Sequence, residues 1–279
     1  MKLSYVSEYG IKGTGNLLIE GDNLLVLQQM QEDYDQTIDL ITIDPPYNTE
    51  IPYIGYKDSS FDEGWAHFIE ERLALAKGFL SETGVVFINI DENELFNLLD
   101  VCYSLFGSEN VNILIWPKVD ERFDKNRIEK PVRNVRSTHE FIVLCYNNRE
   151  KTHFNTTKEG KPLESIISGC GTTSSAKDEV AELLGDRHKF STPKPIALIK
   201  ELIRVSTTTN SIVMDFFAGS GTAGHAVMDL NKEDGGRRRF ILITNNESGI
   251  CESVTYPRLK ACIDANQYYD GFSYLRIED

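Results

Sequence analysis

Short apolar runs alternate along this chain with longer stretches in which apolar residues recur every three to four positions. Such alternation is typical of an α/β fold whose parallel sheet is covered by helices on both faces. A chain of 279 residues with 41% apolar content can bury a core of that size. We therefore predict a doubly wound sheet of seven strands, at residues 17–19, 39–43, 85–90, 111–116, 141–145, 211–214 and 240–243.

The stretches between the predicted strands carry the apolar spacing of helices. Glu94 follows Asp91 by three residues, so the helix that starts there is expected to begin with a capping box. The predicted helices span 63–80, 91–106, 176–184 and 195–206.

The five cysteines are widely spaced and include no Cys-x-x-Cys pair. They indicate free thiols and no metal site. The sequence shows no signal-type stretch at its N-terminus and no apolar run of membrane-spanning length. We expect a cytoplasmic protein.

The tetrapeptide Asp44-Pro45-Pro46-Tyr47 directly follows the predicted strand at 39–43. The Asp44 carboxylate and a rigid Pro45 carbonyl could each accept one N–H of an exocyclic base amine, which would free the nitrogen lone pair to attack a methyl donor. Two successive prolines remove two backbone donors from such a loop, and the Tyr47 ring offers a surface on which an extruded base can stack. The alternative is an ordinary turn after the strand, because Asp and Pro are common turn residues.

A second motif is the glycine-containing turn at 215–222, between the predicted strand at 211–214 and a helix-like stretch. A strand, a tight turn and a helix N-terminus allow the backbone of α/β proteins to approach a nucleotide-like ligand. A P-loop is excluded, because no Gly-Lys-Ser/Thr follows the turn.

With both motifs in view, the chain resembles the β class of S-adenosylmethionine-dependent DNA adenine-N6 methyltransferases, and in particular the modification subunit of type III restriction-modification systems. The sequence at 44–49 is similar to the catalytic motif of that family, and the sequence at 216–222 to its cofactor motif. The catalytic motif comes first, as in the β class, so the resemblance implies a circularly permuted Rossmann-like methyltransferase sheet. Further similar stretches lie at 20–24, 84–94, 192–195 and 245–247.

The resemblance implies that Asp44, Pro45, Pro46 and Tyr47 hold and stack a flipped adenine in DNA. Adenine is implied by Asp at the first position of the motif, and the methyl donor is S-adenosylmethionine with no metal. Methylation of cytosine N4, methylation of adenine in RNA, and a non-catalytic nucleic-acid-binding or assembly subunit are the alternatives.

The resemblance also assigns a set of residues to the cofactor. For Asp22 the alternative is a helix N-cap, and for Glu247, which would take the ribose hydroxyls, it is a surface acid. His225 could touch the cofactor or pack within its helix. The assigned residues are Asp22, Lys194, Asp215, Phe216, Phe217, Ala218, Gly219, Ser220, Gly221, Thr222 and Glu247.

The net charge of −14 has the wrong sign for a DNA-binding protein, but it is unevenly distributed. Residues 1–110 hold 5 Lys/Arg and 20 Asp/Glu, whereas residues 111–279 hold 24 and 23. The cluster Arg237-Arg238-Arg239 is expected to be a solvated turn. The stretch 118–136 carries a local net charge of +3, and we expect it to face DNA, the alternative being a solvated loop. Its basic residues are Lys118, Arg122, Lys125, Arg127, Lys130, Arg133 and Arg136.

We therefore expect a catalytic methyltransferase domain at 1–117 and 191–279. Residues 118–190 form a partly irregular target-recognition region that includes one core strand near 141–145. This region is shorter than the recognition insert of type III modification subunits. The expected partner is double-stranded DNA, and the resemblance admits a homodimer and a restriction or specificity subunit.

Overall fold

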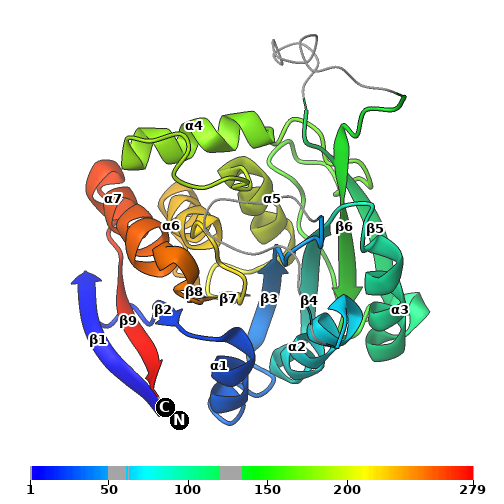
Figure 1. Cartoon of the computed structure of the whole chain (residues 1–279), viewed down its shortest axis with the longest axis horizontal. Coiled ribbons are helices and arrows are strands. Elements are labelled where there is room, and N and C mark those ends of the chain that lie inside the picture. The colour runs from blue at the N-terminus through cyan, green and yellow to red at the C-terminus, as the bar shows by residue number, and fades with distance from the viewer. Residues whose placement is uncertain (1, 50–60, 62, 120–133, 279) are drawn as a thin grey trace.

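The computed structural model describes residues 2–49, 61, 63–119 and 134–278. Within these residues, nine strands form one sheet in the order β1-β9-β2-β8-β7-β3-β4-β6-β5 (Figure 1). The strands are β1 (Lys2–Gly10), β2 (Leu17–Glu20), β3 (Ile38–Ile43), β4 (Leu80–Ile90), β5 (Val111–Pro117), β6 (His139–Tyr146), β7 (Ile212–Asp215), β8 (Arg239–Thr244) and β9 (Gly271–Glu278).

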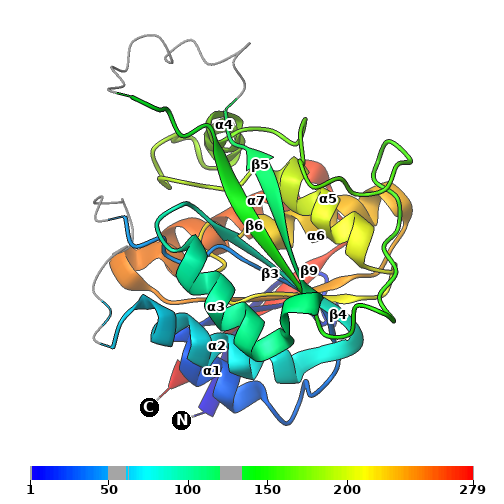
Figure 2. The same ribbon diagram turned by 90° about the vertical axis from the view of Figure 1, so that its right-hand side faces the viewer.

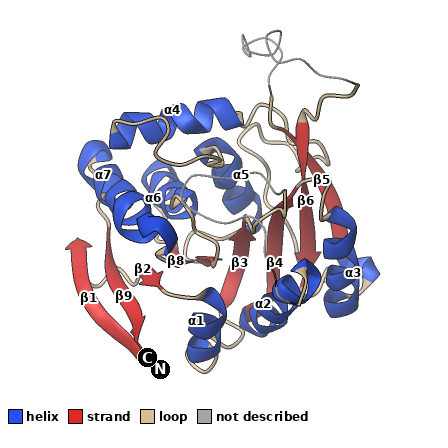
Figure 3. Ribbon diagram, viewed as in Figure 1, coloured by secondary structure: helices blue, strands red, loops and turns tan. Residues whose placement is uncertain are grey.

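Helices connect many of these strands along the chain, and Figure 3 shows the helices in blue and the strands in red. They are α1 (Asn23–Met30), α2 (Trp65–Phe79), α3 (Leu95–Phe106), α4 (Thr173–Leu184), α5 (Ile196–Ser206), α6 (Thr222–Asp234) and α7 (Tyr256–Asn266), with a 3₁₀ turn at Ser108–Asn110, another at Glu247–Gly249 and a π-helical turn at Cys251–Thr255.

The centre of the sheet is parallel. β2, β8, β7, β3 and β4 run in one direction, whereas β4 pairs with β6 and β6 with β5 in antiparallel fashion. The α/β fold with helices on both faces is confirmed. In doubly wound sheets, ligands bind at the carboxyl ends of the parallel strands, and here β3 and β7, which precede the two motifs, are neighbours.

Helices cover both faces of the sheet (Figure 2), and an apolar core lies on each face. Helices α1, α2 and α3 contribute buried side chains to one core, and α5, α6 and α7 contribute to the other. Helix α4 lies across the carboxyl ends of the strands (Figure 1) and buries Ala176 and Val180. The space between α4 and the carboxyl ends of the strands is therefore the place for a site.

Each of the seven predicted strands is present, and the structure adds β1 and β9 at one edge. The two added strands pair with each other in antiparallel fashion. β1 has no fully buried residue, which explains why hydrophobic periodicity did not reveal it.

The predicted capping box at Asp91 and Glu94 is wrong. Helix α3 starts only at Leu95, and the Glu94 side chain makes no cap hydrogen bond. Instead, Asp91 accepts hydrogen bonds from the backbone and side chain of Asn93 at 2.9 Å each. Glu94 accepts one from the Asn48 side chain at 2.7 Å, so it holds the loop that follows β3.

Asn16 connects β8 and β9, the two strands on either side of β2, by hydrogen bonds. This side chain is 1% exposed; it donates to Asp270 at 2.6 Å and to the Gly271 carbonyl at 2.8 Å, and it accepts from the Phe240 backbone N–H at 2.8 Å. We expect Asn16→Leu to lower the free energy of unfolding by about 2–4 kcal/mol, because it leaves buried polar groups without partners. Urea denaturation measures the loss, and the exposed Asn210→Leu is the control. Equal stability of the two variants would contradict this role.

Candidate active site

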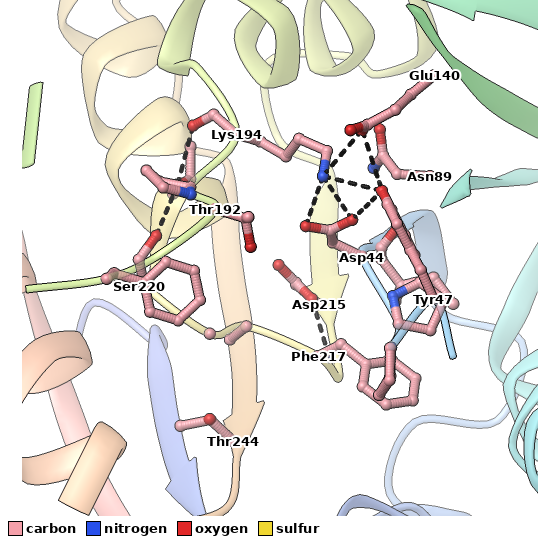
Figure 4. A pocket seen from close by; sticks show the side chains of 18 of the residues that line it. Asp44, Tyr47, Asn89, Glu140, Thr192, Lys194, Asp215, Phe217, Ser220 and Thr244 are labelled. Carbon is pink, nitrogen blue, oxygen red and sulfur yellow. Dashed lines mark hydrogen bonds and ion pairs between the residues drawn. The ribbon is translucent and has the colours of Figure 1, made fainter. Parts of the chain in front are cut away.

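A cavity of about 1340 Å³ opens at the carboxyl ends of the parallel strands. Its walls include Asp44, Pro45, Pro46 and Tyr47 after β3 and the residues from Asp215 to Ser220 after β7. Figure 4 shows Asp215 between Asp44 and Ser220. The two motifs, which are far apart in the sequence, thus face one space.

The loop at 44–47 is held by side chains from two other elements, β6 and α2. The Tyr47 hydroxyl donates to Asp44 Oδ1 at 2.6 Å and to Glu140 Oε2 at 3.2 Å. Trp65 Nε1 donates to the Pro46 carbonyl at 2.7 Å, so this carbonyl already has a partner. These contacts fix the loop without any ligand.

Lys194 reaches the Asp44 carboxylate from the segment before α5 (Figure 4). Its Nζ lies 2.7 Å from each Asp44 oxygen and 2.9 Å from the Tyr47 hydroxyl. The same Nζ lies 3.3 Å from Glu140 Oε2, and Glu140 Oε1 pairs with Lys118 at 3.4 Å. The cluster therefore holds two lysines and two carboxylates around one tyrosine.

Burial and pairing act on the cluster in opposite directions. Burial raises the pKa of Asp44, and the neighbouring Lys194 offsets only part of that rise. Burial also raises the pKa of Glu140, but Lys194 and Lys118 outweigh it and lower that pKa overall. The pKa of Lys194 is raised, because the two carboxylates outweigh its burial. Lys194 is thus a protonated cation.

The glycine turn after β7 has the backbone that its sequence predicts. Gly219 and Gly221 have positive φ angles of 47° and 79°, which glycine adopts without a steric penalty. A Cβ on Gly224 would lie 2.8 Å from Leu259 and 2.9 Å from Leu242, so α6 packs closely on the sheet there. Gly219, Gly221 and Gly224 have the Gly-x-Gly-x-x-Gly spacing of dinucleotide folds, so the turn alone does not distinguish one nucleotide-like ligand from another.

Asp215 ends β7 at the floor of the cavity and is 8% exposed. Its carboxylate accepts from the Phe217 backbone N–H at 3.0 Å. Burial, with a contribution from the Asp44 charge, raises the pKa of Asp215 to about 8. A cation placed beside Asp215 would reverse this shift.

Arg258 is a buried cation beneath the turn that the sequence did not reveal. It is 0% exposed, and its Nη1 donates to Ser220 Oγ at 2.8 Å and to Thr222 Oγ1 at 2.9 Å. Its Nε and Nη2 have no hydrogen-bond partner in the described part of the chain. The guanidinium therefore holds the turn and adds a positive charge behind it.

Asp22, Glu247 and His225, which the sequence also linked to the cofactor, lie in different environments. Asp22 lines the cavity and is the N-cap of α1, accepting from Leu25 N at 3.2 Å, so the N-cap alternative is confirmed. Glu247 lines the cavity beyond β8. His225 is buried beside Tyr268, and burial lowers the pKa of this imidazole to about 3. Its helix-packing alternative is favoured.

The predicted DNA-facing segment is only partly described. Lys118 and Arg136 line the cavity, whereas Arg122, Lys125, Arg127, Lys130 and Arg133 lie outside the described residues.

The prediction of a solvated turn at 237–239 is wrong for Arg238. This side chain is 5% exposed, and it forms a hydrogen bond with Thr207 at 2.9 Å and an ion pair with Asp234 at 2.9 Å.

In the described residues, no group of three or more His, Cys, Asp or Glu side chains is arranged to hold a metal. None of the helices described is long and apolar enough to cross a membrane.

The fold and the site define a doubly wound α/β protein in which the loop at 44–47 and the glycine turn at 215–222 face one cavity at the strand ends. The DNA methylase family model matches residues 38–256, and the chain belongs to this family.

Two curated relatives illustrate the match. The type III restriction-modification enzyme StyLTI Mod subunit of Salmonella typhimurium is 28% identical over 348 aligned positions, which cover 85% of this chain and 53% of that protein. This chain therefore spans about half the length of that relative. The type II methyltransferase M.KpnI of Klebsiella pneumoniae is 24% identical, with 96% of this chain and 92% of that protein covered.

A solved structure shows the same fold. The crystal structure of the M1.HpyAVI-SAM complex superposes with a TM-score of 0.58 at 19% identity and covers 87% of this chain and 99% of that one.

Proposed function

We propose that this chain transfers a methyl group from S-adenosylmethionine to the N6 amine of a flipped adenine in DNA. The observation that carries the proposal is the shared cavity. Asp44 follows β3, Asp215 ends the neighbouring strand β7, and both line one space that is large enough for a nucleoside cofactor and an extruded base. Membership of the DNA methylase family supports the same activity.

The residues present fit the proposed cofactor. The buried carboxylate of Asp215, whose pKa is raised to about 8, suits a ligand that brings positive charge. The turn from Gly219 to Thr222 offers backbone at the start of α6, and Glu247 lies past β8, where a carboxylate can accept ribose hydroxyls. When bound, S-adenosylmethionine supplies a methyl group on a positively charged sulfur.

The catalytic loop would hold the target amine. Asp44 accepts one N–H and the Pro45 carbonyl a second, so the nitrogen lone pair is directed at the methyl group. Once the nitrogen has received the methyl group, Asp44 would take the proton that the nitrogen loses and pass it to solvent. Tyr47, whose hydroxyl is fixed on Asp44, presents its ring to the base. Positioning and electrostatics provide the rate enhancement.

The choice of adenine rests on the resemblance of 44–47 to the adenine form of this motif, in which Asp stands first. Cytosine presents an amine of the same geometry, so Asp44 can accept a hydrogen bond from the amine of either base. The base is therefore the first property to measure.

We propose that residues 118–190 read the DNA and that the rest of the chain is the catalytic domain. The alignment with the StyLTI Mod subunit spans 348 positions, more than the 279 residues of this chain, so that relative carries inserted residues that this chain lacks. Because this recognition region is short, we propose that a second protein contributes to DNA recognition. We propose either a second copy of this chain or a restriction or specificity subunit.

Arg258 offers a test of the cofactor site. We expect Arg258→Met to weaken S-adenosylmethionine binding by about tenfold, because a buried cation behind the turn favours the carboxylate of the methionine portion. Binding of 5′-methylthioadenosine, which lacks that portion, should change little. Calorimetry measures both dissociation constants, with the buried Arg238→Met as control. An equal loss for both ligands would contradict this role of Arg258.

The proposed reaction is tested by incubating the chain with labelled S-adenosylmethionine and either unmethylated double-stranded DNA or RNA. We expect label in the DNA alone. Label in the RNA alone would overturn the DNA assignment. Cofactor binding without transfer to either polymer, also after addition of a partner subunit, would favour a non-catalytic binding subunit.

A further inference from the structure

Lys194 occupies the atoms that the proposed reaction needs. Its ammonium lies 2.7 Å from both oxygens of Asp44, the oxygens that must accept an N–H of the target amine. An ammonium is a stronger donor to a carboxylate than a neutral amine. Oδ1 accepts from both Lys194 and Tyr47, and Oδ2 accepts from Lys194, so the target amine must compete with Lys194 for the Asp44 oxygens.

Glu140 provides a second position for this cation. Its Oε2 is already 3.3 Å from Lys194 Nζ, so a small movement of the ammonium exchanges one carboxylate for the other. Lys194 and Glu140 are 7% and 8% exposed, so the cation needs a buried carboxylate wherever it goes. Glu140 lies on β6 and is fixed by Tyr47 at 3.2 Å and by Lys118 at 3.4 Å.

We infer that Lys194 is a displaceable counter-ion of the catalytic carboxylate. In the free protein, Lys194 keeps Asp44 ionised and blocks access to its oxygens. When the target amine binds to Asp44, Lys194 moves to Glu140. Lys194 and Glu140 are positioning residues for Asp44. This inference rests on the proposed function and deepens it, because it makes access to Asp44 depend on an exchange of partners.

The surrounding charges determine what removal of the lysine would do. Among the described residues, Asp91 after β4 lies near Glu140, Asp215 at the end of β7 lies near Asp44, and Lys118 after β5 is the second cation that acts on Glu140. Without Lys194, two buried carboxylates would share one cation. One of them would take up a proton near neutral pH.

The first test needs neither DNA nor cofactor. Carboxylates whose folded pKa exceeds the unfolded value destabilise the fold increasingly as pH rises through the interval between the two. The melting temperature of Lys194→Met should therefore fall more steeply than that of wild type between about pH 5 and pH 9. Adding Glu140→Gln should remove most of that slope. Lys200→Met is the matched control, because Lys200 also bridges two carboxylates, Asp229 and Glu233, outside the cavity.

The second test measures single-turnover methylation of DNA at saturating cofactor. Lys194→Met should slow transfer by about 100-fold at neutral pH and shift the pH profile to higher pH, whereas Lys194→Arg keeps the charge and should preserve the profile. Glu140→Gln alone should slow transfer by about tenfold, because the cation stays on Asp44. The double variant should be faster than Lys194→Met.

The competing role for Lys194 is direct binding of the cofactor. In that case Lys194→Met would raise the dissociation constant for S-adenosylmethionine while leaving both pH profiles unchanged, and Glu140→Gln would rescue nothing. That result overturns the inference. If wild type transfers no methyl group at all, the proposed function fails, but the melting curves still report whether Lys194 neutralises the two carboxylates.

Discussion

Asp44→Ala is expected to reduce the rate constant of methyl transfer by about 10³-fold or more, because it removes the acceptor that orients the amine in the transition state. The affinity for S-adenosylmethionine should stay close to that of wild type, since the cofactor turn after β7 is untouched. Single-turnover labelling measures the rate, and calorimetry the affinity. The expected effect is thus confined to the chemical step.

Two further variants make this result interpretable. Asp44→Asn keeps the volume and one acceptor oxygen but loses the charge that Lys194 requires, so it should also be strongly impaired. Asp39→Ala is the matched control, because Asp39 lies at the opposite end of β3, where it accepts from Ser81 at 3.1 Å and from Ile212 N at 3.2 Å. Equal transfer by wild type and Asp44→Ala would show that the site lies elsewhere.

Asp215→Asn is expected to have two large and opposite effects. Cofactor affinity should fall by about 100-fold, because the variant removes the buried charge that a cationic ligand would pair with. The free protein should become more stable by about 1–3 kcal/mol near pH 8, because the amide avoids the burial of a carboxylate and still accepts from Phe217 N.

The pH dependence of this gain has a definite sign. Burial raises the pKa of Asp215 from 3.8, the ordinary value of an aspartate, to about 8 in the folded protein. An acid with a raised folded pKa costs stability as pH rises between those two values, so the advantage of Asp215→Asn should grow from about pH 4 to pH 8. Thermal denaturation across that interval measures it. A constant difference in melting temperature would contradict the raised pKa.

The sequence predicted the parts of this site that are local. Asp44 to Tyr47 and Asp215 to Thr222 are continuous stretches that directly follow strand patterns, so hydrophobic periodicity and turn chemistry were sufficient to find them. The same periodicity predicted the seven core strands, because those strands are buried, and it predicted helices α2, α3, α4 and α5 but not α1 and α7. It missed β1 and β9, which form the more exposed edge of the sheet.

The parts that the sequence did not predict depend on pairing across the fold. Lys194 was assigned to the cofactor, but its ammonium contacts Asp44, 150 residues away along the chain. Glu140 lies within an apolar strand and Arg258 within a helix, and neither stands in a recognisable motif. A charged residue in an apolar stretch was the available signal, since such a residue is buried only where it has partners.

We propose that the amine of adenine is methylated in the cavity at the carboxyl ends of β3 and β7. The most direct measurement is mass spectrometry of the nucleosides released from DNA after incubation with the wild-type chain and S-adenosylmethionine. We predict N6-methyldeoxyadenosine, absent from the matching Asp44→Ala reaction. N4-methyldeoxycytidine as the product, or the same amount of methylated adenine from both proteins, would contradict the account.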